Sequence, residues 1–215
     1  SKIRTVLIPP ERGRIFDADG RVIADNQRIL TVTVDWSTVR RESTRLALFT
    51  HLSGPLKVPV DDLMRRYDPC YNLPEPCNKG QLYDTLLPLP LKEDVDEATI
   101  NYIKERGEDY PGVDVVEQYR RVYPYAPLAA HVVGYMGPIT AETLQSYLDQ
   151  GYKRNERVGQ FGVELTMERQ LHGTWGKRVF EIDASGAVTR ELTEQRIDPV
   201  AGFDVQLSID LDVQQ

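Results

Sequence analysis

Two acidic side chains four residues apart are the strongest candidates for chemistry in this sequence. Glu164 and Glu168 fall in a stretch with helical character, where residues i and i+4 share one face. A pair of carboxylates on one face could act as the acid and the base or nucleophile of a glycosidase. The same spacing is also typical of a solvated or ion-paired helix face, and we favour this second interpretation.

The other side chains that could act as bases or nucleophiles do not form a recognisable catalytic set. His131 lies in an apolar stretch, Ala-Ala-His-Val-Val, and we expect it to be a buried, hydrogen-bonded histidine and not a base. His172 precedes Gly173, a position that fits the last turn of a helix, where a positively charged side chain interacts favourably with the helix dipole. No serine is followed by a lysine three positions later, and the sequence contains neither Lys-Thr-Gly nor a Gly-x-Ser-x-Gly elbow. We therefore expect no catalytic residues in this chain.

Three histidines and two cysteines are too few for a four-ligand zinc site without additional carboxylates, so we expect no metal and no cofactor. Cys70 and Cys77 flank a short segment that contains prolines and an asparagine. The residues alone leave two alternatives open. In a cytosolic protein the pair would be free thiols, and in an exported protein a disulfide.

The composition limits the classes of partner. The 215 residues include 26 Lys and Arg against 33 Asp and Glu, a formal net charge of −7. A protein that grips nucleic acid needs a surplus of cations to displace phosphate counterions, so we expect no nucleic-acid partner. No segment approaches the roughly 18–20 apolar residues that cross a bilayer.

The pattern of apolar residues predicts clusters of strands with several helices between them. We expect a hairpin over 14–24, further strands at 29–34, 113–123, 179–183 and 203–210, and a turn at 185–186. We expect helices over 36–51, ended by Ser53-Gly54-Pro55, and over 94–107, 140–150 and 163–172. Clustered strands indicate an α+β fold with mostly antiparallel strands. A proline-rich composition shift divides it into a base lobe, 1–35 and 115–215, and an inserted head lobe, 36–114.

Four segments resemble, in order, motifs of class B penicillin-binding proteins. Residues 12–24 are similar to R-G-x-I-x-D-x-x-G-x-x-L-A, although Ala18-Asp19 stands where the family often has Arg-Asn. Residues 121–137 are similar to R-x-Y-P…H-x-x-G-Y-x-G, residues 159–176 to G-x-x-G-x-E…E-x-x-L-x-G-x-x-G, and residues 202–214 to the strand that leads into the transpeptidase domain. The motif positions expected to be structural or interdomain residues are Arg12, Gly13, Asp17, Arg121, Tyr123, Pro124, Gly159, Gly162, Glu164 and Glu168.

The resemblance implies the non-catalytic pedestal, or dimerisation region, of an elongation-type peptidoglycan D,D-transpeptidase that is sensitive to penicillin. The acylated serine of this family lies in an S-x-x-K motif that would follow Gln215. A transmembrane helix would precede the chain and anchor it at the extracytoplasmic face of the bacterial inner membrane. The implied partners are the protein's own transpeptidase domain, a SEDS-type glycosyltransferase, cell-shape scaffold proteins and a second copy as a homodimer. Because export favours oxidation, we predict a disulfide between Cys70 and Cys77.

The charged motif residues have no catalytic task in a pedestal. We expect Arg12, Arg121, Glu164 and Glu168 to converge into one ion-paired network, since an arginine fork can bridge two carboxylates. The alternative is four separate solvated charges. Two alternative functions also stay open, a stand-alone wall hydrolase using Glu164 and Glu168, and a structural or adhesive module.

Overall fold

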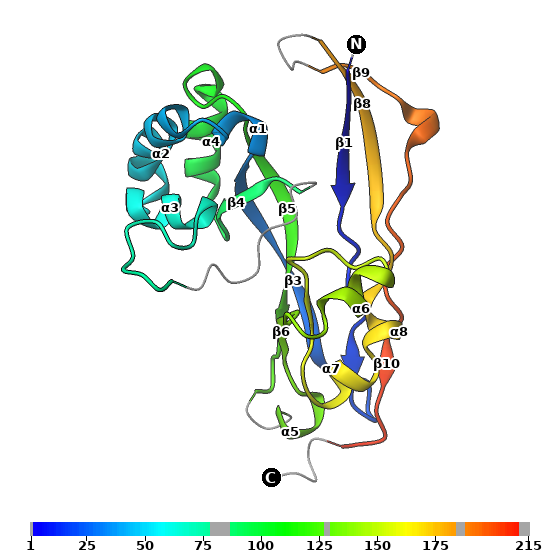
Figure 1. Cartoon of the computed structure of the whole chain (residues 1–215). Coiled ribbons are helices and arrows are strands. Elements are labelled where there is room, and N and C mark those ends of the chain that lie inside the picture. Colours follow the sequence, from blue (N-terminus) through cyan, green and yellow to red (C-terminus); the bar gives the residue numbers. More distant parts are fainter. Residues whose placement is uncertain (1, 78–86, 127–129, 184–187, 211–215) are drawn as a thin grey trace. The chain divides into compact units, whose positions relative to one another are not determined.

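The computed structural model describes residues 2–77, 87–126, 130–183 and 188–210. The chain divides into two compact units: the inserted unit, residues 28–118, and the terminal unit, residues 1–27 with 119–215. The sequence-based boundaries lie at 35/36 and 114/115, whereas the units change over at 27/28 and 118/119. Both unit boundaries fall inside long strands, β3 (Val22–Val34) and β5 (Val113–Val122) (Figure 1). A boundary inside a continuous strand cannot be located from a shift in amino-acid composition.

The inserted unit packs helices around one apolar core. Its elements are α1 (Trp36–Val39), α2 (Glu42–Leu56), α3 (Val60–Tyr67), β4 (Leu89–Lys92), α4 (Glu97–Glu105) and the 3₁₀ turn η1 (Gly107–Asp109), with the adjoining parts of β3 and β5. Phe49 and Leu52 of α2 are fully buried against Leu63 of α3 in this core. Asp96 begins α4 as expected of an N-cap, because its carboxylate accepts a hydrogen bond from the Thr99 amide at 2.9 Å.

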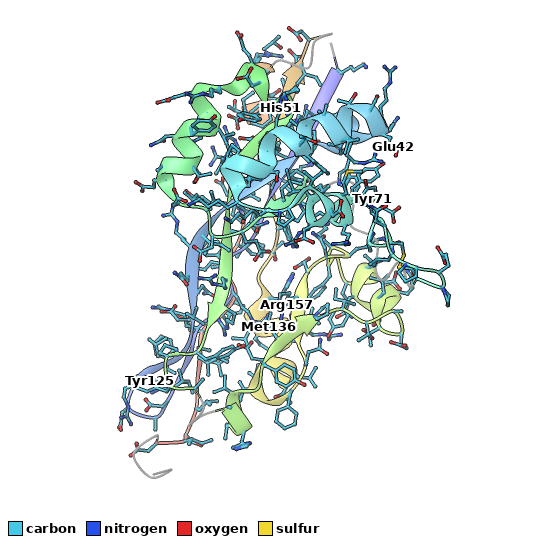
Figure 2. All side chains as sticks on the ribbon, turned by 90° about the vertical axis from the view of Figure 1, so that its left-hand side faces the viewer. Glu42, His51, Tyr71, Tyr125, Met136 and Arg157 are labelled. Atoms are coloured by element: carbon cyan, nitrogen blue, oxygen red, sulfur yellow. A yellow bond between two sulfur atoms is a disulfide. The ribbon has the colours of Figure 1, made fainter. Side chains whose placement is uncertain are left out.

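The expected end of the helix near Ser53 is wrong. A short α1 is followed by a separate α2, which Figure 2 marks at Glu42 and His51 and which continues through Pro55 to Leu56. Leu56 is fully buried in the core, and Lys57 then ends the helix in the left-handed conformation at φ 54°. Burial of this last apolar residue outweighs the loss of one backbone donor at Pro55.

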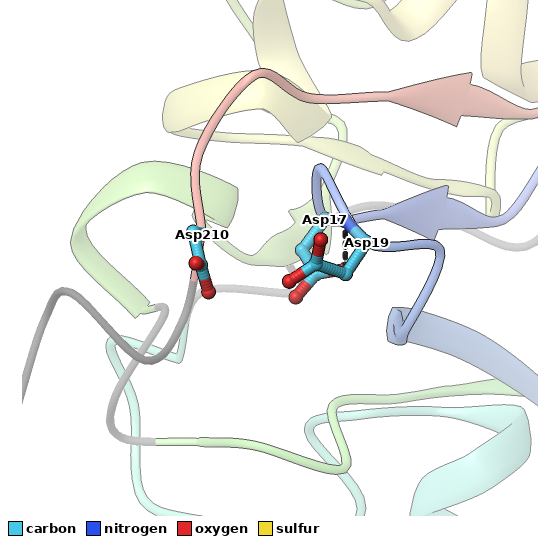
Figure 3. A group of neighbouring side chains, drawn as sticks. All are labelled: Asp17, Asp19 and Asp210. Carbon is cyan, nitrogen blue, oxygen red and sulfur yellow. Dashed lines mark hydrogen bonds between the residues drawn. The ribbon is translucent and has the colours of Figure 1, made fainter.

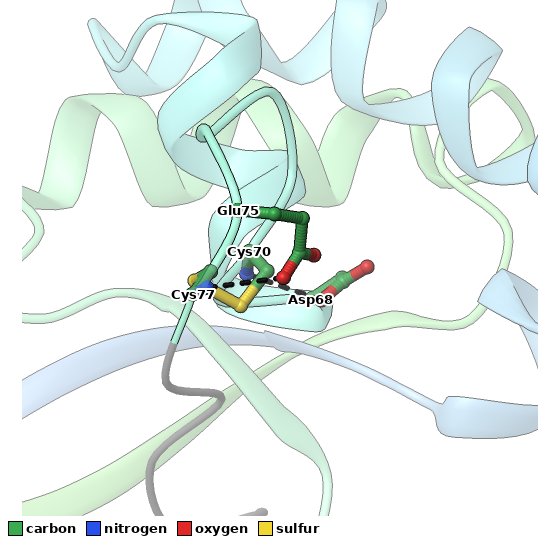
Figure 4. The surroundings of a disulfide bond; sticks show 4 residues. All are labelled: Asp68, Cys70, Glu75 and Cys77. Atoms are coloured by element: carbon green, nitrogen blue, oxygen red, sulfur yellow. Dashed lines mark hydrogen bonds between the residues drawn. A yellow bond between two sulfur atoms is a disulfide. The ribbon is translucent and has the colours of Figure 1, made fainter.

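Cys70 and Cys77 form a disulfide in the inserted unit, with their Cα atoms 5.8 Å apart (Figure 4). The carboxylate of Asp68 accepts a hydrogen bond from the Cys70 amide, and Glu75 accepts one from the Cys77 amide, both at 3.1 Å. The segment begins directly after α3, whose last residue Tyr67 packs against Trp36 with ring centroids 5.4 Å apart. The bond therefore closes a loop next to the core of this unit.

Replacing both Cys70 and Cys77 with alanine is expected to lower the unfolding free energy of the inserted unit by about 2–3 kcal/mol. The bond closes a short loop of sequence separation 7, which restricts the unfolded chain by about that amount in the loop-entropy model. The chain has two tryptophans, so urea unfolding followed by Trp36 fluorescence in a Trp175→Phe background reports on this unit. An unchanged midpoint and slope in the double variant would contradict the prediction.

The terminal unit contains antiparallel sheets and short helices. β1 (Lys2–Ile8), β8 (Gly176–Ile182) and β9 (Val188–Glu191) form one antiparallel sheet in the order β1-β8-β9. β2 (Ile15–Phe16) pairs antiparallel with β3 and parallel with β10 (Val205–Gln206). β6 (Met136–Pro138) pairs antiparallel with β7 (Arg157–Gly159), where Figure 2 labels Met136 and Arg157. The helical elements are α5 (Ala130–Val133), α6 (Leu144–Asp149), α7 (Gly162–Thr166), α8 (Glu168–His172) and the 3₁₀ turn η2 (Thr193–Gln195).

The predicted fold class, mixed helices with mostly antiparallel strands, is confirmed, but several local expectations are wrong. His131 is exposed on α5. The expected helix over 140–150 begins only at Leu144, because a turn closed by Thr143 and Thr140 precedes it. The expected strand over 203–210 is reduced to Val205–Gln206. The turn expected at 185–186 lies outside the described residues.

No helix in the described ranges combines the length and the apolar character that crossing a membrane requires.

Candidate functional site

Four charged motif residues from distant parts of the sequence meet inside the terminal unit. Arg12 lies just before β2, Arg121 lies near the end of β5, Glu164 lies on α7, and Glu168 begins α8. The Glu164 side chain is fully buried, and the other three are at most 9% exposed. The expected single helix over 163–172 is broken at Met167, and both carboxylates nevertheless point to Arg12.

Arg12 bridges the two acids with its planar guanidinium. Its Nε donates to Oε2 of Glu164 at 2.9 Å, while Nη1 and Nη2 donate to the two carboxylate oxygens of Glu168 at 3.1 and 2.7 Å. Burial lowers the pKa of Arg12, but the hydrogen bond and charge of Glu168, followed by the charge and hydrogen bond of Glu164, raise it overall above its ordinary value. Arg12 is therefore a permanent cation between two carboxylates.

Arg121 ties the same carboxylate to the opening segment of the chain. Its Nε donates to Oε1 of Glu164 at 2.7 Å, and its Nη1 donates to the Gly13 carbonyl at 2.8 Å and to Oδ1 of Asn26 at 3.0 Å. Asn26 in turn donates through Nδ2 to the Arg12 carbonyl at 2.6 Å. Residues 12–13, β3, β5 and α7 are thus joined by charge-assisted hydrogen bonds.

Two tyrosine hydroxyls also donate hydrogen bonds to these carboxylates. The Tyr123 hydroxyl donates to Oε1 of Glu164 at 3.2 Å, and the Tyr152 hydroxyl donates to Oε1 of Glu168 at 3.1 Å. Burial, followed by the negative charge of the neighbouring glutamate, raises the pKa of both phenols above the ordinary value. Both hydroxyls consequently remain protonated donors throughout the physiological pH range.

The two motif glycines allow the backbone of β7 and α7 to approach closely. The Gly159 amide donates to Oε2 of Glu168 at 2.8 Å, and a Cβ at Gly159 would lie 2.0 Å from the Glu164 carbonyl oxygen. Gly162 has φ +61°, and a Cβ there would lie 2.4 Å from the Val132 carbonyl oxygen. Pro124 lies elsewhere, as an exposed residue of the turn that closes Tyr123 to Ala126.

Asp17 belongs to a second charged group, outside the arginine–glutamate network. Its Oδ1 accepts hydrogen bonds from the backbone amides of Asp19 and Arg21, and its Oδ2 accepts one from Nε of Arg21 at 2.7 Å. Burial raises the pKa of Asp17, but the hydrogen bonds and charge of Arg21 lower it overall below the ordinary value. Asp17, Asp19 and Asp210 lie close together (Figure 3). Arg21 forms salt bridges with all three, so its guanidinium already supplies a positive charge to this acidic group.

The geometry argues against catalysis by Glu164 and Glu168. Each carboxylate oxygen of this pair accepts a hydrogen bond from an arginine, a tyrosine or a backbone amide, and both side chains are buried. A glycosidase needs carboxyl groups that open toward a sugar and a water molecule. Both acids are instead engaged in buried ion pairs with Arg12 and Arg121.

Comparisons with known proteins identify the family of the chain. The family model of the penicillin-binding protein dimerisation domain matches residues 7–207. Peptidoglycan D,D-transpeptidase MrdA of Acinetobacter baumannii is 31% identical over 214 residues, which cover 100% of this chain and 30% of that protein. The Escherichia coli (strain K12) protein of the same name is 27% identical over 219 residues, covering 100% and 32%. The chain thus spans about a third of the length of these relatives.

Solved structures show the same fold. The complex between penicillin-binding protein PBP2 and MreC from Helicobacter pylori matches with a TM-score of 0.74 at 20% identity, covering 99% of this chain and 37% of that chain. Penicillin-binding protein 2B from Streptococcus pneumoniae matches with a TM-score of 0.70 at 19% identity, covering 98% and 42%. The resemblance predicted from the sequence motifs is confirmed, and this chain belongs to the penicillin-binding protein dimerisation domain family.

Proposed function

We propose that this chain is the non-catalytic pedestal of a membrane-anchored peptidoglycan D,D-transpeptidase that works in cell-wall elongation. The observation that carries the proposal is the buried network. In it, the two candidate catalytic carboxylates, Glu164 and Glu168, form ion pairs with Arg12 and Arg121. Such a network makes a rigid base from segments far apart in sequence. A rigid base suits the task of holding a catalytic domain at a fixed distance from the membrane.

The names of the relatives support the reaction and one partner. The full-length relatives are named peptidoglycan D,D-transpeptidase, and the Helicobacter pylori structure is a complex with MreC. We extend both to this protein as proposals. The transpeptidase domain would follow this chain, a scaffold of the MreC type would bind the pedestal outside the inner membrane, and a SEDS-type glycosyltransferase would bind it at the membrane.

The chain by itself is expected to bind no β-lactam covalently. It lacks a serine with a lysine three positions later, so it has no activated nucleophile to acylate. Incubation with a fluorescent penicillin, followed by intact-mass measurement, should leave the chain unmodified, and the full-length protein should gain one adduct. A stoichiometric adduct on residues 1–215 would contradict the prediction.

A deletion in the full-length protein tests the pedestal function directly. A variant that joins the membrane anchor to the catalytic domain without residues 7–207 should still be acylated by penicillin, which shows that the catalytic domain is folded. The same variant should fail to retain the MreC-type scaffold in a pull-down and fail to restore rod shape in depleted cells. If it retains the scaffold and restores rod shape, the chain is not a partner-binding pedestal.

A further inference from the structure

A histidine and a glutamate face each other in the terminal unit, and neither belongs to the arginine–glutamate network. His172 ends α8, and Glu156 directly precedes β7. Nε2 of the imidazole lies 2.5 Å from Oε2 of Glu156, and both side chains are only 12% exposed. Nδ1 of the same ring lies 2.8 Å from the Gly173 carbonyl oxygen. Each ring nitrogen therefore faces an oxygen that accepts hydrogen bonds.

This geometry requires one proton more than a neutral imidazole and a carboxylate carry together. A neutral imidazole has a single N–H, so it can donate to only one of the two oxygens, and the other contact would join two acceptors. Oε1 of Glu156 accepts further hydrogen bonds from the Trp175 indole at 2.8 Å and from the Lys153 amide at 2.5 Å. Three donors around one carboxyl group suit an anion. The additional proton therefore lies on His172, as an imidazolium that donates to both oxygens.

The other titratable and charged groups around the imidazole have partners of their own or face solvent. The Tyr152 ring stacks on the imidazole with ring centroids 3.9 Å apart, and its hydroxyl donates to Glu168. Burial, followed by the charge of Glu168, raises the pKa of Tyr152, so the phenol keeps its proton. Glu168, one turn earlier on α8, is bound by Arg12 at 2.7 Å, and Arg169 of the same helix is exposed. Among the described residues, Glu156 is thus the acid that pairs with the imidazole.

We infer that the Glu156–His172 pair is a pH-dependent latch that joins the end of α8 to the segment before β7 and, through the Trp175 indole, to the segment that leads into β8. At low pH the imidazolium holds both contacts and the latch is closed. As the pH rises, the ring loses its charge and one of its two N–H groups, so one contact is lost and the stabilising contribution of the pair falls. Histidine ordinarily changes its charge between about pH 5 and 8, which sets the range to be measured. The inference concerns the fold of this chain and does not rest on the proposed function.

Urea unfolding of the chain at a series of pH values tests the latch. The parent and all variants carry Trp36→Phe, so that Trp175 fluorescence reports on the terminal unit. Between about pH 6 and 9, the urea midpoint of the parent should fall by about 0.5 M more than that of Glu156→Gln or His172→Gln, because each variant lacks one member of the pair. The matched control is His131→Gln, which changes an exposed histidine of the same unit and should follow the parent. If the parent and both latch variants show the same pH dependence, the inference is overturned.

NMR of the histidine rings in the folded parent chain gives a second measurement, which does not depend on the folding of any variant. The chain has three histidines, and the other two, His51 and His131, are exposed and serve as internal controls. Below about pH 6, His172 should give two ring N–H signals, because both hydrogens are held by acceptors and exchange slowly with water. The exposed rings should give none, and one His172 signal should disappear as the pH rises. If His172 gives at most one ring N–H signal at every pH, the ring does not hold the second proton and there is no latch.

Discussion

Replacing Glu164 with alanine is expected to lower the unfolding free energy of the terminal unit by about 3–5 kcal/mol. Glu164 is fully buried and accepts hydrogen bonds from both Arg12 and Arg121. Its removal leaves Arg121 with only carbonyl-type acceptors and leaves Arg12 with one carboxylate, so buried positive charge loses its counterion. Stranding one partner of a buried ion pair typically has a cost of this size.

The measurement is urea unfolding followed by Trp175 fluorescence in a Trp36→Phe background, since Trp175 lies in the terminal unit. Arg12→Ala should have a cost similar to that of Glu164→Ala, and the double variant should cost less than the sum of the two, because the second change removes a charge already stranded. The control is the exposed pair Arg196 and Asp198 of the same unit, whose side chains are 48% and 71% exposed. Breaking it should cost about 0–1 kcal/mol. If both Glu164→Ala and Arg12→Ala lie within about 0.5 kcal/mol of the parent, the network does not stabilise the fold.

The convergence of the four charges can be predicted from sequence because each lies in a motif and because buried charges require partners. The short-range elements can be predicted for similar reasons. The hairpin around Gly20 and the capped helix α4 depend on residues adjacent in sequence. These are the features that local propensity and turn chemistry determine.

The missed features depend on contacts that the sequence pattern does not encode. Asn26 and Tyr152 complete the network, yet each is a single polar residue without a spacing signal. The apolar neighbours of His131 predict its burial, but in the short α5 only Val133 of those neighbours is buried. The end of α2 and the break at Met167 likewise follow from packing, which overrides the turn signal and the helical period.

Gly159→Ala is expected to have the second largest effect, a loss of about 3 kcal/mol in the terminal unit. The added Cβ would lie 2.0 Å from the Glu164 carbonyl oxygen and 2.5 Å from the Leu165 amide nitrogen, both backbone atoms that no side-chain rotation can move. Overpacking of this kind typically costs about 1–3 kcal/mol, and a backbone collision falls at the upper end. To relieve it, β7 must move away from α7, which also lengthens the hydrogen bond from the Gly159 amide to Glu168.

The matched control is Gly107→Ala, because a Cβ added at Gly107 would have no heavy atom within 4 Å and the residue has no positive φ. There the substitution should be neutral or stabilise by up to about 1 kcal/mol, by restricting the unfolded chain. Trp175 and Trp36 fluorescence report the two units separately, and the loss in Gly159→Ala should appear in the Trp175 transition. A Gly159→Ala transition that coincides with the parent would show that β7 and α7 have room to separate. The close approach would then not be what holds Glu168 in the network, and the hydrogen bonds from Arg12 and Tyr152 would position it.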